Sequence, residues 1–449
     1  MTIFNGIEAL PPGYALRVER GDVTSWQYWQ LPTERSDLGS PEACVRQLRE
    51  LVDEVVRLHQ ISDVPLGAFL SGGIDSSALV ALMGRTGGDS IKTFTVGFDE
   101  GPAELNEIES ARVVSRALKT DHRQQIVRGE DLLVELPRII SYLDQPTVDG
   151  VNTYFIAKFA RQHVKVALSG LGGDEVFGGY PKFTLIPRLA PYLPLWRGLG
   201  FPLRRGIVAA VDRLMGSHAR NGRTAKLGGL AYVDSINSLY ALSRIVFWPS
   251  QKSRLFAQSV WDTDVKGVDS VGLLRNYVSG RESDLVQQIS ALEIRNYLGH
   301  MTLRDTDAMS MAHSLEVRVP WLDHKLVEFT YSLPAALKMR TGRTKYLLQE
   351  IARDLLPADI LSRPKAGFEL PIGYWLKHQL RPWVESVLSP ESIEARGLFR
   401  ADAVQQVYAD FVGGRQSWAP VWMLFTLELW LRSNVDGVHS LGLEEMCVS

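Results

Sequence analysis

The pattern of apolar and polar positions before residue 180 differs from the pattern after it. Up to that point, short and mostly apolar runs alternate with amphipathic stretches. The apolar runs predict strands over residues 64–70, 92–98, 122–127 and 164–168, and the amphipathic stretches predict helices over residues 41–59, 76–83, 104–119, 129–143 and 152–162. Mostly apolar strands separated by helices are typical of a parallel sheet that is covered on both faces.

The regions that flank this pattern differ from it. The first 36 residues predict short strand and turn pieces, with a strand over residues 14–18, and they are too short for a domain. After residue 180 the strand signals fade and the pattern predicts helices with proline-rich joints. We therefore expect three parts: an edge fragment over residues 1–36, an α/β domain over residues 37–190 and a mainly helical region over residues 191–449.

Composition narrows the class of protein. With 49 basic and 51 acidic side chains in 449 residues, the formal charge is −2, so no global basic field exists to attract nucleic acid or an anionic membrane. The two cysteines, Cys44 and Cys447, form no paired motif, which argues against a disulfide scaffold or a zinc site. No apolar run reaches the roughly 20 residues that a membrane span needs. These observations predict a soluble protein of a reducing cytoplasm.

A Ser-Gly segment follows the first apolar strand. Residues 71–77 read Ser-Gly-Gly-Ile-Asp-Ser-Ser and stand between that strand and a helix. Glycines let phosphate oxygens approach the backbone, and the amino end of a helix offers unpaired N–H groups to an anion. Asp75 would then need a divalent cation between its carboxylate and such an anion. The alternative is structural: Ser71 or Ser76 caps the helix and Asp75 complements its dipole.

A second Ser-Gly segment follows the strand over residues 164–168. It reads Ser-Gly-Leu-Gly-Gly-Asp-Glu over residues 169–175. Since the carboxyl ends of parallel strands meet at one edge of a sheet, we expect Asp75 and Asp174 to lie close together and to hold Mg²⁺ on a nucleotide triphosphate. A solvated loop or a helix cap is the alternative for the acidic pair Asp174-Glu175.

These segments and five more, in matching order over nearly the whole chain, resemble the synthetase domain of asparagine synthetase. The matching segments are SGGIDSS at 71–77, TFTVGFDE at 93–100, TDH at 120–122, LSGLGGDEVFGGY at 168–180, DAMSMAHSLEVRVPWLD at 307–323, TKYLLQEIARDLLP at 344–357 and RPKAGFELPIGYW at 363–375. The resemblance implies a parallel-sheet domain of the adenine-nucleotide α-hydrolase-like (PP-loop) type, followed by a mainly helical region. It also implies that a carboxylate attacks the α-phosphate of ATP with release of pyrophosphate, and that ammonia then displaces AMP to give an amide.

The resemblance assigns roles residue by residue. ATP and Mg²⁺ are the implied cofactors, aspartate is the default carboxylate, and Lys345 matches the lysine that neutralises charge at the α-phosphorus. The resemblance implies that Asp75 and Asp174 hold the metal, and that these two residues and Lys345 are the catalytic residues. The implied contacts with ATP and pyrophosphate come from Leu70, Ser71, Gly72, Gly73, Asp75, Ser76, Val96, Ser169 and Gly170. Glu316 and Arg318 are candidates for the acceptor pocket, with an internal ion pair as their alternative.

Two departures from the family pattern change the expected substrates. Complete family members begin with a glutaminase domain whose nucleophile is a cysteine at position 2, whereas this chain has Thr2 and only a remnant of that domain's tail. We therefore expect that it cannot hydrolyse glutamine by itself, and that it uses free ammonia, receives ammonia from a separate glutaminase subunit or is a truncated gene product. Leu171 stands where many members carry an acidic residue that accepts a proton from the incoming amine.

Three alternatives to asparagine formation stay open at this point. The same adenylation chemistry could serve another acceptor, as in β-lactam synthetases or lasso-peptide cyclases. Leu171 in place of the acidic residue favours this first alternative. A catalytically silent subunit of a glutaminase complex is a second reading, against which the retained Asp75, Asp174 and Lys345 speak. Modification of transfer RNA by a related ATP pyrophosphatase is the third alternative. Such enzymes usually need thiols and a basic surface, which this chain lacks.

Overall fold

The computed structural model describes residues 2–33, 39–86, 90–214, 227–278, 282, 284–340, 344–361, 363 and 369–437. Within these residues, one sheet contains five strands in the order β5-β4-β3-β6-β7, and every neighbouring pair is parallel. The strands are β3 (Leu66–Phe69), β4 (Lys92–Gly97), β5 (Asp121–Ile126), β6 (Val166–Leu168) and β7 (Glu316–Arg318). This confirms the predicted α/β fold.

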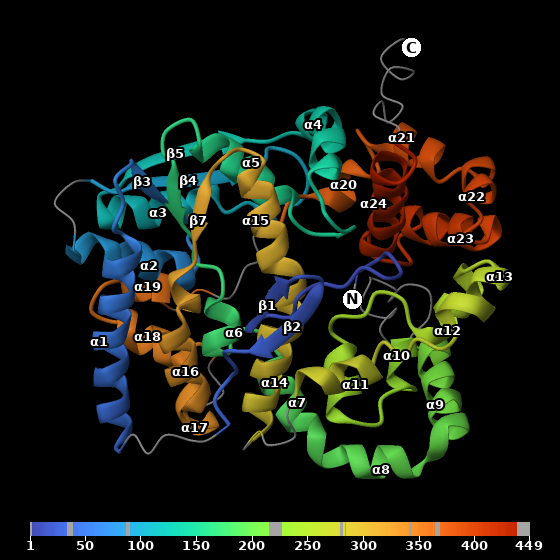
Figure 1. The fold of residues 1–449 in the computed structure, drawn as a ribbon, viewed down its shortest axis with the longest axis horizontal. Coiled ribbons are helices and arrows are strands. Elements are labelled where there is room, and N and C mark those ends of the chain that lie inside the picture. The colour runs from blue at the N-terminus through green and yellow to red at the C-terminus, as the bar shows by residue number, and fades with distance from the viewer. Residues whose placement is uncertain are drawn as a thin grey trace.

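Helices cover both faces of the sheet, and each face has its own core (Figure 1). Ala68, Leu70 and Leu168 point into a core shared with α1 (Pro41–His59), α2 (Ile74–Thr86) and α3 (Ile108–Leu118). Phe94 and Val96 point into the opposite core, which contains α4 (Gly129–Ser141), α5 (Val151–Ala160) and α15 (Leu303–Met311). The central strands β3, β4 and β6 are mostly buried because helices cover both faces of the sheet, whereas the edge strand β5 is polar and partly exposed.

The first long helix illustrates how the local pattern specifies an element. Ser40 accepts a hydrogen bond from the backbone of Ala43 at 3.3 Å, and Pro41 occupies the first turn, where its missing N–H is not needed. The buried side chains recur at helical spacing along one face of α1, and they are Cys44, Leu48, Val52, Val55 and Val56. The predicted bounds of 41–59 are confirmed.

β7 was not predicted from the sequence. It comes from the region after residue 180, for which the pattern indicated helices, and it pairs with β6 through Val166↔Glu316 and Leu168↔Arg318. A strand of three residues is too short to establish an alternation of its own. The sheet thus receives its last strand from the mainly helical part of the chain, and the domain boundaries proposed above stay a prediction.

The rest of the chain is mainly helical, as predicted. The remaining helices are α6 (Gly173–Phe177), α7 (Lys182–Leu189), α8 (Leu193–Gly198), α9 (Gly200–Leu214), α10 (Leu227–Leu230), α11 (Ile236–Ala241), α12 (Pro249–Leu255), α13 (Gln258–Val260), α14 (Leu285–Leu292), α16 (His324–Ser332), α17 (Ala335–Lys338), α18 (Tyr346–Ala352), α19 (Ala358–Leu361), α20 (Ile372–Trp375), α21 (Arg381–Val387), α22 (Pro390–Arg396), α23 (Ala401–Val412) and α24 (Ala419–Asn434). Trp422 and Trp430 of α24 are buried core residues.

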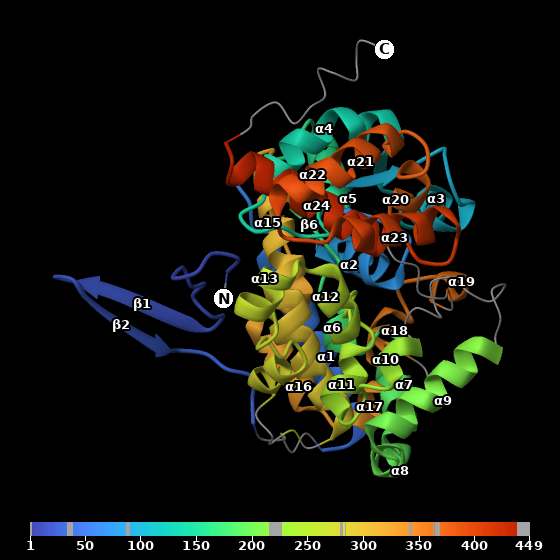
Figure 2. The same cartoon turned by 90° about the vertical axis from the view of Figure 1, so that its right-hand side faces the viewer.

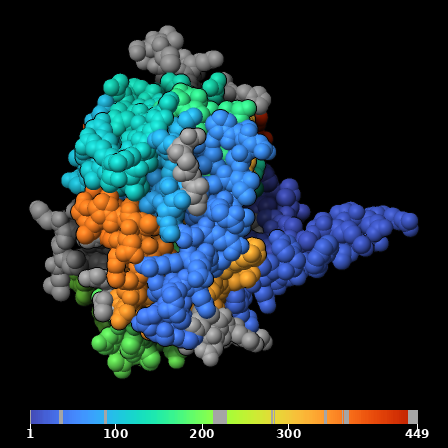
Figure 3. Space-filling model, turned by 90° about the vertical axis from the view of Figure 1, so that its left-hand side faces the viewer, coloured from blue at the N-terminus to red at the C-terminus, as the bar shows by residue number. Residues whose placement is uncertain are grey.

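An antiparallel hairpin, β1 (Tyr14–Glu19) with β2 (Asp22–Gln27), projects from the body of the molecule (Figures 2 and 3). Leu16, Val18, Val23 and Trp26 are exposed on it. A two-stranded sheet is at best marginally stable alone in water. This hairpin exposes apolar side chains, and each of its two strands is an edge strand. Among the described residues, no helix has the length and apolarity that crossing a bilayer requires.

Candidate functional site

The two Ser-Gly segments lie side by side at the carboxyl edge of the sheet. β3 and β6 are neighbours, with Gly67 paired to Ala167 and Ala68 paired to Leu168. Both strands therefore deliver the segments that follow them to the same edge, in the crevice where open α/β sheets bind their ligands. The amino ends of α2 and α6 begin there and carry Asp75 and Asp174 in their first turns.

Glycines allow these two segments to touch. A side chain on Gly170 would come within 2.8 Å of the backbone nitrogen of Ser76, and one on Gly173 would collide with the carboxylate of Asp75. Gly72 has φ +79°, a conformation that favours glycine, and a side chain there would meet the backbone of Ser110 at 2.5 Å. The residue type at these positions is therefore set by close approach of backbone segments.

Lys345 joins the two acidic side chains. Its ammonium nitrogen lies 2.7 Å from Oδ1 of Asp174 and also contacts Oδ2 of Asp75. The lysine side chain is 7% exposed, against 21% and 17% for Asp75 and Asp174, so the lysine is the deepest member of the cluster and the two acidic side chains are partly exposed. Residues 75, 174 and 345, far apart in sequence, form one compact cluster.

The electrostatics of the cluster favour a charged lysine. Burial alone would lower the pKa of Lys345, but the carboxylates of Asp75 and Asp174 outweigh burial, so that its pKa is raised. Lys345 also has φ +55°, which is uncommon for a residue with a side chain. It immediately precedes α18, and its side chain reaches Asp75 and Asp174 at the sheet edge.

The first Ser-Gly segment is organised by its own hydroxyl groups. The hydroxyls of Ser71 and Ser76 lie 3.0 Å apart, and Ser76 donates to the carbonyl of Gly73 at 3.2 Å. The amides of Ser71 and Gly73 donate to Ser76 and Ser71 at 3.2 and 3.3 Å. This compact loop places two hydroxyl groups at the amino end of α2, and phosphate oxygens accept hydrogen bonds from hydroxyl groups and from the amino end of a helix.

The remaining residues assigned to ATP surround this loop. Leu70 and Val96 are buried in the sheet, where the Leu70 carbonyl accepts a hydrogen bond from the hydroxyl of Thr95. Ser169 continues the pairing of β6 with β7 through its amide, which donates to the carbonyl of Arg318 at 2.8 Å. All of these residues, with Gly170, lie at the carboxyl edge of adjacent strands. Their role toward adenosine stays a prediction.

The candidates for the acceptor pocket separate into two places. Leu171 belongs to the second Ser-Gly segment, and its amide donates to the hydroxyl of Ser169 at 3.3 Å. Glu316 and Arg318 form an ion pair of 2.6 Å on β7, and Arg318 also donates to the carbonyls of His59 and Ile61 at 2.8 and 2.7 Å. These contacts correspond to the internal ion pair that was the alternative for Glu316 and Arg318.

Three further residues at the site were missed by sequence reasoning. Gly179 packs so closely that a side chain there would collide with Oδ1 of Asp174 and Cε of Lys345. Arg363 donates to the carbonyls of Gly72 and Ser110 at 3.5 and 3.3 Å and so braces the first Ser-Gly segment. Trp321 contacts the backbone of Asp75 and is treated below. Each stands inside a segment that resembles the family, which was the only available signal.

Glu175, next to Asp174, is fully buried, and the hydroxyl of Tyr180 donates to its Oε1 at 2.7 Å. Burial raises the pKa of Glu175 to about 7, and the Asp174 carboxylate adds to this rise. The acidic pair predicted from the sequence thus has two environments: Asp174 faces the lysine, and Glu175 points into the interior.

The raised pKa of Glu175 predicts a pH-dependent stability. Since its pKa in the folded state lies above the ordinary value of 4.5, the unfolded chain releases this proton first as the pH rises. The free energy of unfolding therefore falls between about pH 4.5 and 7, by on the order of 3 kcal/mol. Glu175→Gln keeps an acceptor for Tyr180 and should abolish this fall. Urea denaturation of both proteins in EDTA at about pH 5 and about pH 8 measures the free energy of unfolding. An equal fall in the unaltered protein and in Glu175→Gln would show that Glu175 is not the group responsible.

The carboxylates suit a magnesium ion by their chemistry. Mg²⁺ is usually held by one or two carboxylates together with phosphate oxygens, and Asp75 and Asp174 supply two partly exposed carboxylates beside a phosphate-type loop. Within the described residues, no group of three or more histidine, cysteine, aspartate or glutamate side chains is arranged to hold a metal without such added oxygens. The residues present therefore fit Mg²⁺ that arrives with a nucleotide.

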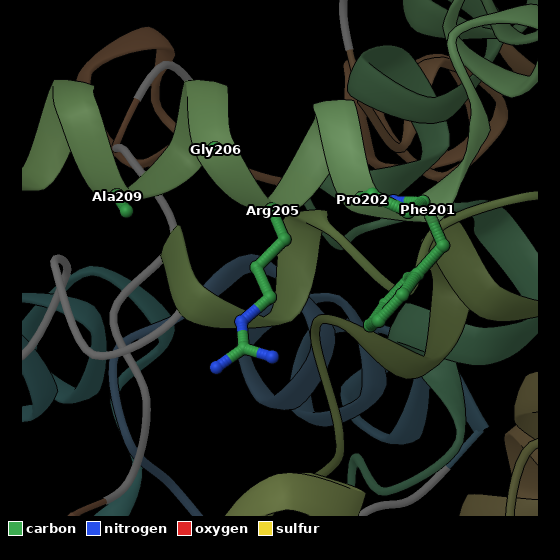
Figure 4. A pocket seen from close by; sticks show the side chains of 5 residues that line it. All are labelled: Phe201, Pro202, Arg205, Gly206 and Ala209. Atoms are coloured by element: carbon green, nitrogen blue, oxygen red, sulfur yellow. The ribbon is translucent and has the colours of Figure 1, made fainter.

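A separate surface hollow of about 410 Å³ lies on α9 and is lined by Phe201, Pro202, Arg205, Gly206 and Ala209 (Figure 4). Its lining contains one charged group and no carboxylate. α9 stands apart from α2, α6 and α18 (Figure 1). The chemistry of the sheet edge is therefore unrelated to this hollow.

The sheet order and the Ser-Gly segments define the class: an α/β protein of the PP-loop type, with the two Ser-Gly segments at the carboxyl ends of β3 and β6. The family model described as asparagine synthase matches residues 47–432. The chain belongs to the asparagine synthase family.

Relatives in this family are longer than the chain. Asparagine synthetase 1 (glutamine-hydrolyzing) of Bacillus subtilis is 30% identical over 440 residues, which cover 96% of this chain and 66% of the relative. A putative glutamine-hydrolyzing asparagine synthetase of Mycobacterium tuberculosis is 32% identical, with 96% and 64% covered. Amidase chyE of Penicillium rubens is 25% identical over 445 residues, with 90% and 64% covered. The chain spans about two thirds of the length of these relatives.

Proposed function

We propose that the protein is an ATP-dependent amide-forming ligase that releases AMP and pyrophosphate, with aspartate and ammonia as the default substrates. The observation that carries the proposal is the cluster of Lys345 with Asp75 and Asp174 beside the first Ser-Gly segment. Membership of the asparagine synthase family supports it.

The residues of this chain have distinct tasks in such a reaction. A substrate carboxylate oxygen attacks the α-phosphorus of ATP, and the bond from that phosphorus to the pyrophosphate oxygen breaks. Negative charge grows on the phosphate oxygens during this step, and the buried point charge of Lys345 stabilises it in surroundings where water does not screen it. The hydroxyls of Ser71 and Ser76 and the amino end of α2 would hold the departing pyrophosphate.

Asp75 and Asp174 would hold Mg²⁺ against the phosphate chain of ATP. When bound, the ion neutralises charge on the phosphate oxygens. The two carboxylates also keep Lys345 protonated, because they raise its pKa despite burial. Their contacts with its ammonium group hold the side chain at the sheet edge. In the second half of the reaction, the nitrogen of ammonia attacks the acyl carbon, AMP leaves and the nitrogen loses a proton.

Exchange of labelled pyrophosphate into ATP tests the proposal. We expect exchange that depends on Mg²⁺ and on a carboxylic acid, tested with aspartate first, and AMP as the nucleotide product once ammonium is added. Formation of ADP in place of AMP would rule out attack at the α-phosphorus. Mg-dependent binding of ATP without exchange for any acid would favour the silent-subunit reading.

A different acceptor is the second candidate, and Leu171 favours it. Leucine cannot accept the proton that the attacking amine must lose, so an amine with its own neighbouring base, or a pocket with another base, suits the site better than ammonia with aspartate. An exchange panel of amino acids and short peptides, each with and without ammonium, separates the two. Efficient asparagine production would argue against the second candidate.

We also propose that the chain receives ammonia from a separate glutaminase chain in the cytoplasm. The support is the projecting hairpin β1–β2, whose exposed Leu16, Val18, Val23 and Trp26 are suited to a partner sheet, and the relatives named as glutamine-hydrolyzing. Thr2 donates its hydroxyl to the carbonyl of Ile7 at 2.7 Å. The isolated chain should use ammonium and fail with glutamine. Amide formation from glutamine alone would overturn this proposal.

A further inference from the structure

A short helical turn, η7 (Pro320–Leu322), packs against both acidic segments of the site. It follows β7, the edge strand beside β6, and so lies next to the loop that β6 delivers. Its residues belong to neither Ser-Gly segment. Its position raises the question of what sets the separation between Asp75 and Asp174.

Trp321 of this turn touches the elements that carry both carboxylates. Its indole N–H donates to the backbone carbonyl of Asp75 at 3.3 Å, at the long end of the hydrogen-bond range. The same ring meets the ring of Phe177 edge-on, with 5.7 Å between centroids and 85° between planes. Phe177 ends α6, which begins beside Asp174. Trp321 is fully buried, so packing on every side holds its ring in place.

The next residue restrains the second loop directly. Gly172 has φ +91°, and a side chain on it would collide with the side chain of Leu322. Leu322 therefore lies on the backbone of the second Ser-Gly segment, two positions before Asp174. The two consecutive side chains thus contact the first segment through Trp321 and the second through Leu322.

We propose that Trp321 is a positioning residue, which sets the separation of the Asp75 and Asp174 carboxylates by bracing α2 through its N–H and α6 through its ring, with Leu322 restraining the intervening loop. This inference rests on the proposed function, since it concerns binding of MgATP by these two carboxylates.

Trp321→Phe is the direct test, because phenylalanine retains an aromatic ring and loses the N–H. Supporting groups behind metal-binding side chains typically change metal affinity by a factor of 10 to 100, so we expect about a tenfold rise in the Kd for ATP at fixed Mg²⁺ and a similar rise in the Mg²⁺ concentration at half-saturation. Calorimetric titration of ATP into the full chain measures both without turnover. Leu322→Ala should weaken binding in the same direction and less strongly.

Trp430→Phe is the matched control. Trp430 is also buried and donates its N–H to a backbone carbonyl, that of Leu143, at 2.7 Å, but it belongs to α24, away from the site. Both variants should lose thermal stability to a similar extent, and Trp321→Phe alone should weaken ATP binding. Equal affinity in the two variants would overturn the inference. If the unaltered chain binds no MgATP at all, the proposed function fails instead.

Discussion

Lys345→Met is expected to lower the rate of pyrophosphate exchange by about 10² to 10³-fold, the loss typical of removing one charged or hydrogen-bonding group aimed at a transition state. Methionine keeps an unbranched apolar side chain at this buried position but carries no charge. Negative charge that develops at the α-phosphorus then lacks its stabilising partner, while the Ser-Gly segment and both carboxylates remain. We expect kcat to fall far more than the KM for ATP rises, because the interaction strengthens in the transition state.

The same substitution should destabilise the protein without ligand. Asp75 and Asp174 both contact the lysine nitrogen and would face each other without a counter-charge. Breaking a buried ion pair by removing one partner costs about 3 kcal/mol or more. Urea denaturation in EDTA measures this loss. Added Mg²⁺ should recover part of it, because Asp75 and Asp174 would hold the ion and its positive charge would replace that of the lysine.

Lys338→Met is the matched control for Lys345→Met. Lys338 is also buried, but burial lowers its pKa to about 8 and outweighs the opposing effect of the Asp284 charge. Methionine at 338 should leave the rate unchanged and keep or raise stability at neutral pH. If both methionine variants lost the same activity, Lys345 would be a structural residue and its assigned role would be wrong.

Gly179→Ala should abolish most activity although it removes no charged or polar group. The added methyl group would occupy the space of Oδ1 of Asp174 and Cε of Lys345. Both are ends of side chains that can move, so the fold should accommodate the change with a modest loss of stability. The displaced groups are those that the proposed chemistry needs, and misplacement by about 1 Å can cost about 100-fold in rate.

Pyrophosphate exchange and thermal melting together check this second prediction. Gly206→Ala in α9 is the control, since a side chain there meets nothing within 4 Å and alanine favours a helix. It should keep full activity and melt at an equal or higher temperature. Normal exchange by Gly179→Ala would show that the spacing of Lys345 and Asp174 is not critical, and would weaken the whole assignment of the site.

Several features of this protein follow from the sequence because they depend on local patterns. The alternation of apolar and amphipathic runs predicts the parallel sheet, and capping by Ser40 with Pro41 defines the start of α1. The two Ser-Gly segments each follow an apolar strand, and the edge-sharing rule for parallel strands places them together before any coordinates are known. The roles of Lys345 and of the ATP contacts came from resemblance alone, and the substrates stay proposals.

The tertiary structure decided what depends on contacts between distant segments. β7 has three residues, too few for a pattern, and its place in the sheet depends on pairing with β6. Arg318 lies in a resembling segment, yet it binds Glu316 and the end of α1. Folding brings Gly179 next to Asp174 and Lys345, and it brings Trp321 next to Asp75. The importance of Gly179 and Trp321 for the site therefore cannot be inferred from the local sequence. Hydrophobic periodicity records which face of an element is buried, whereas the identity of the neighbour on that face depends on the packing of the whole chain.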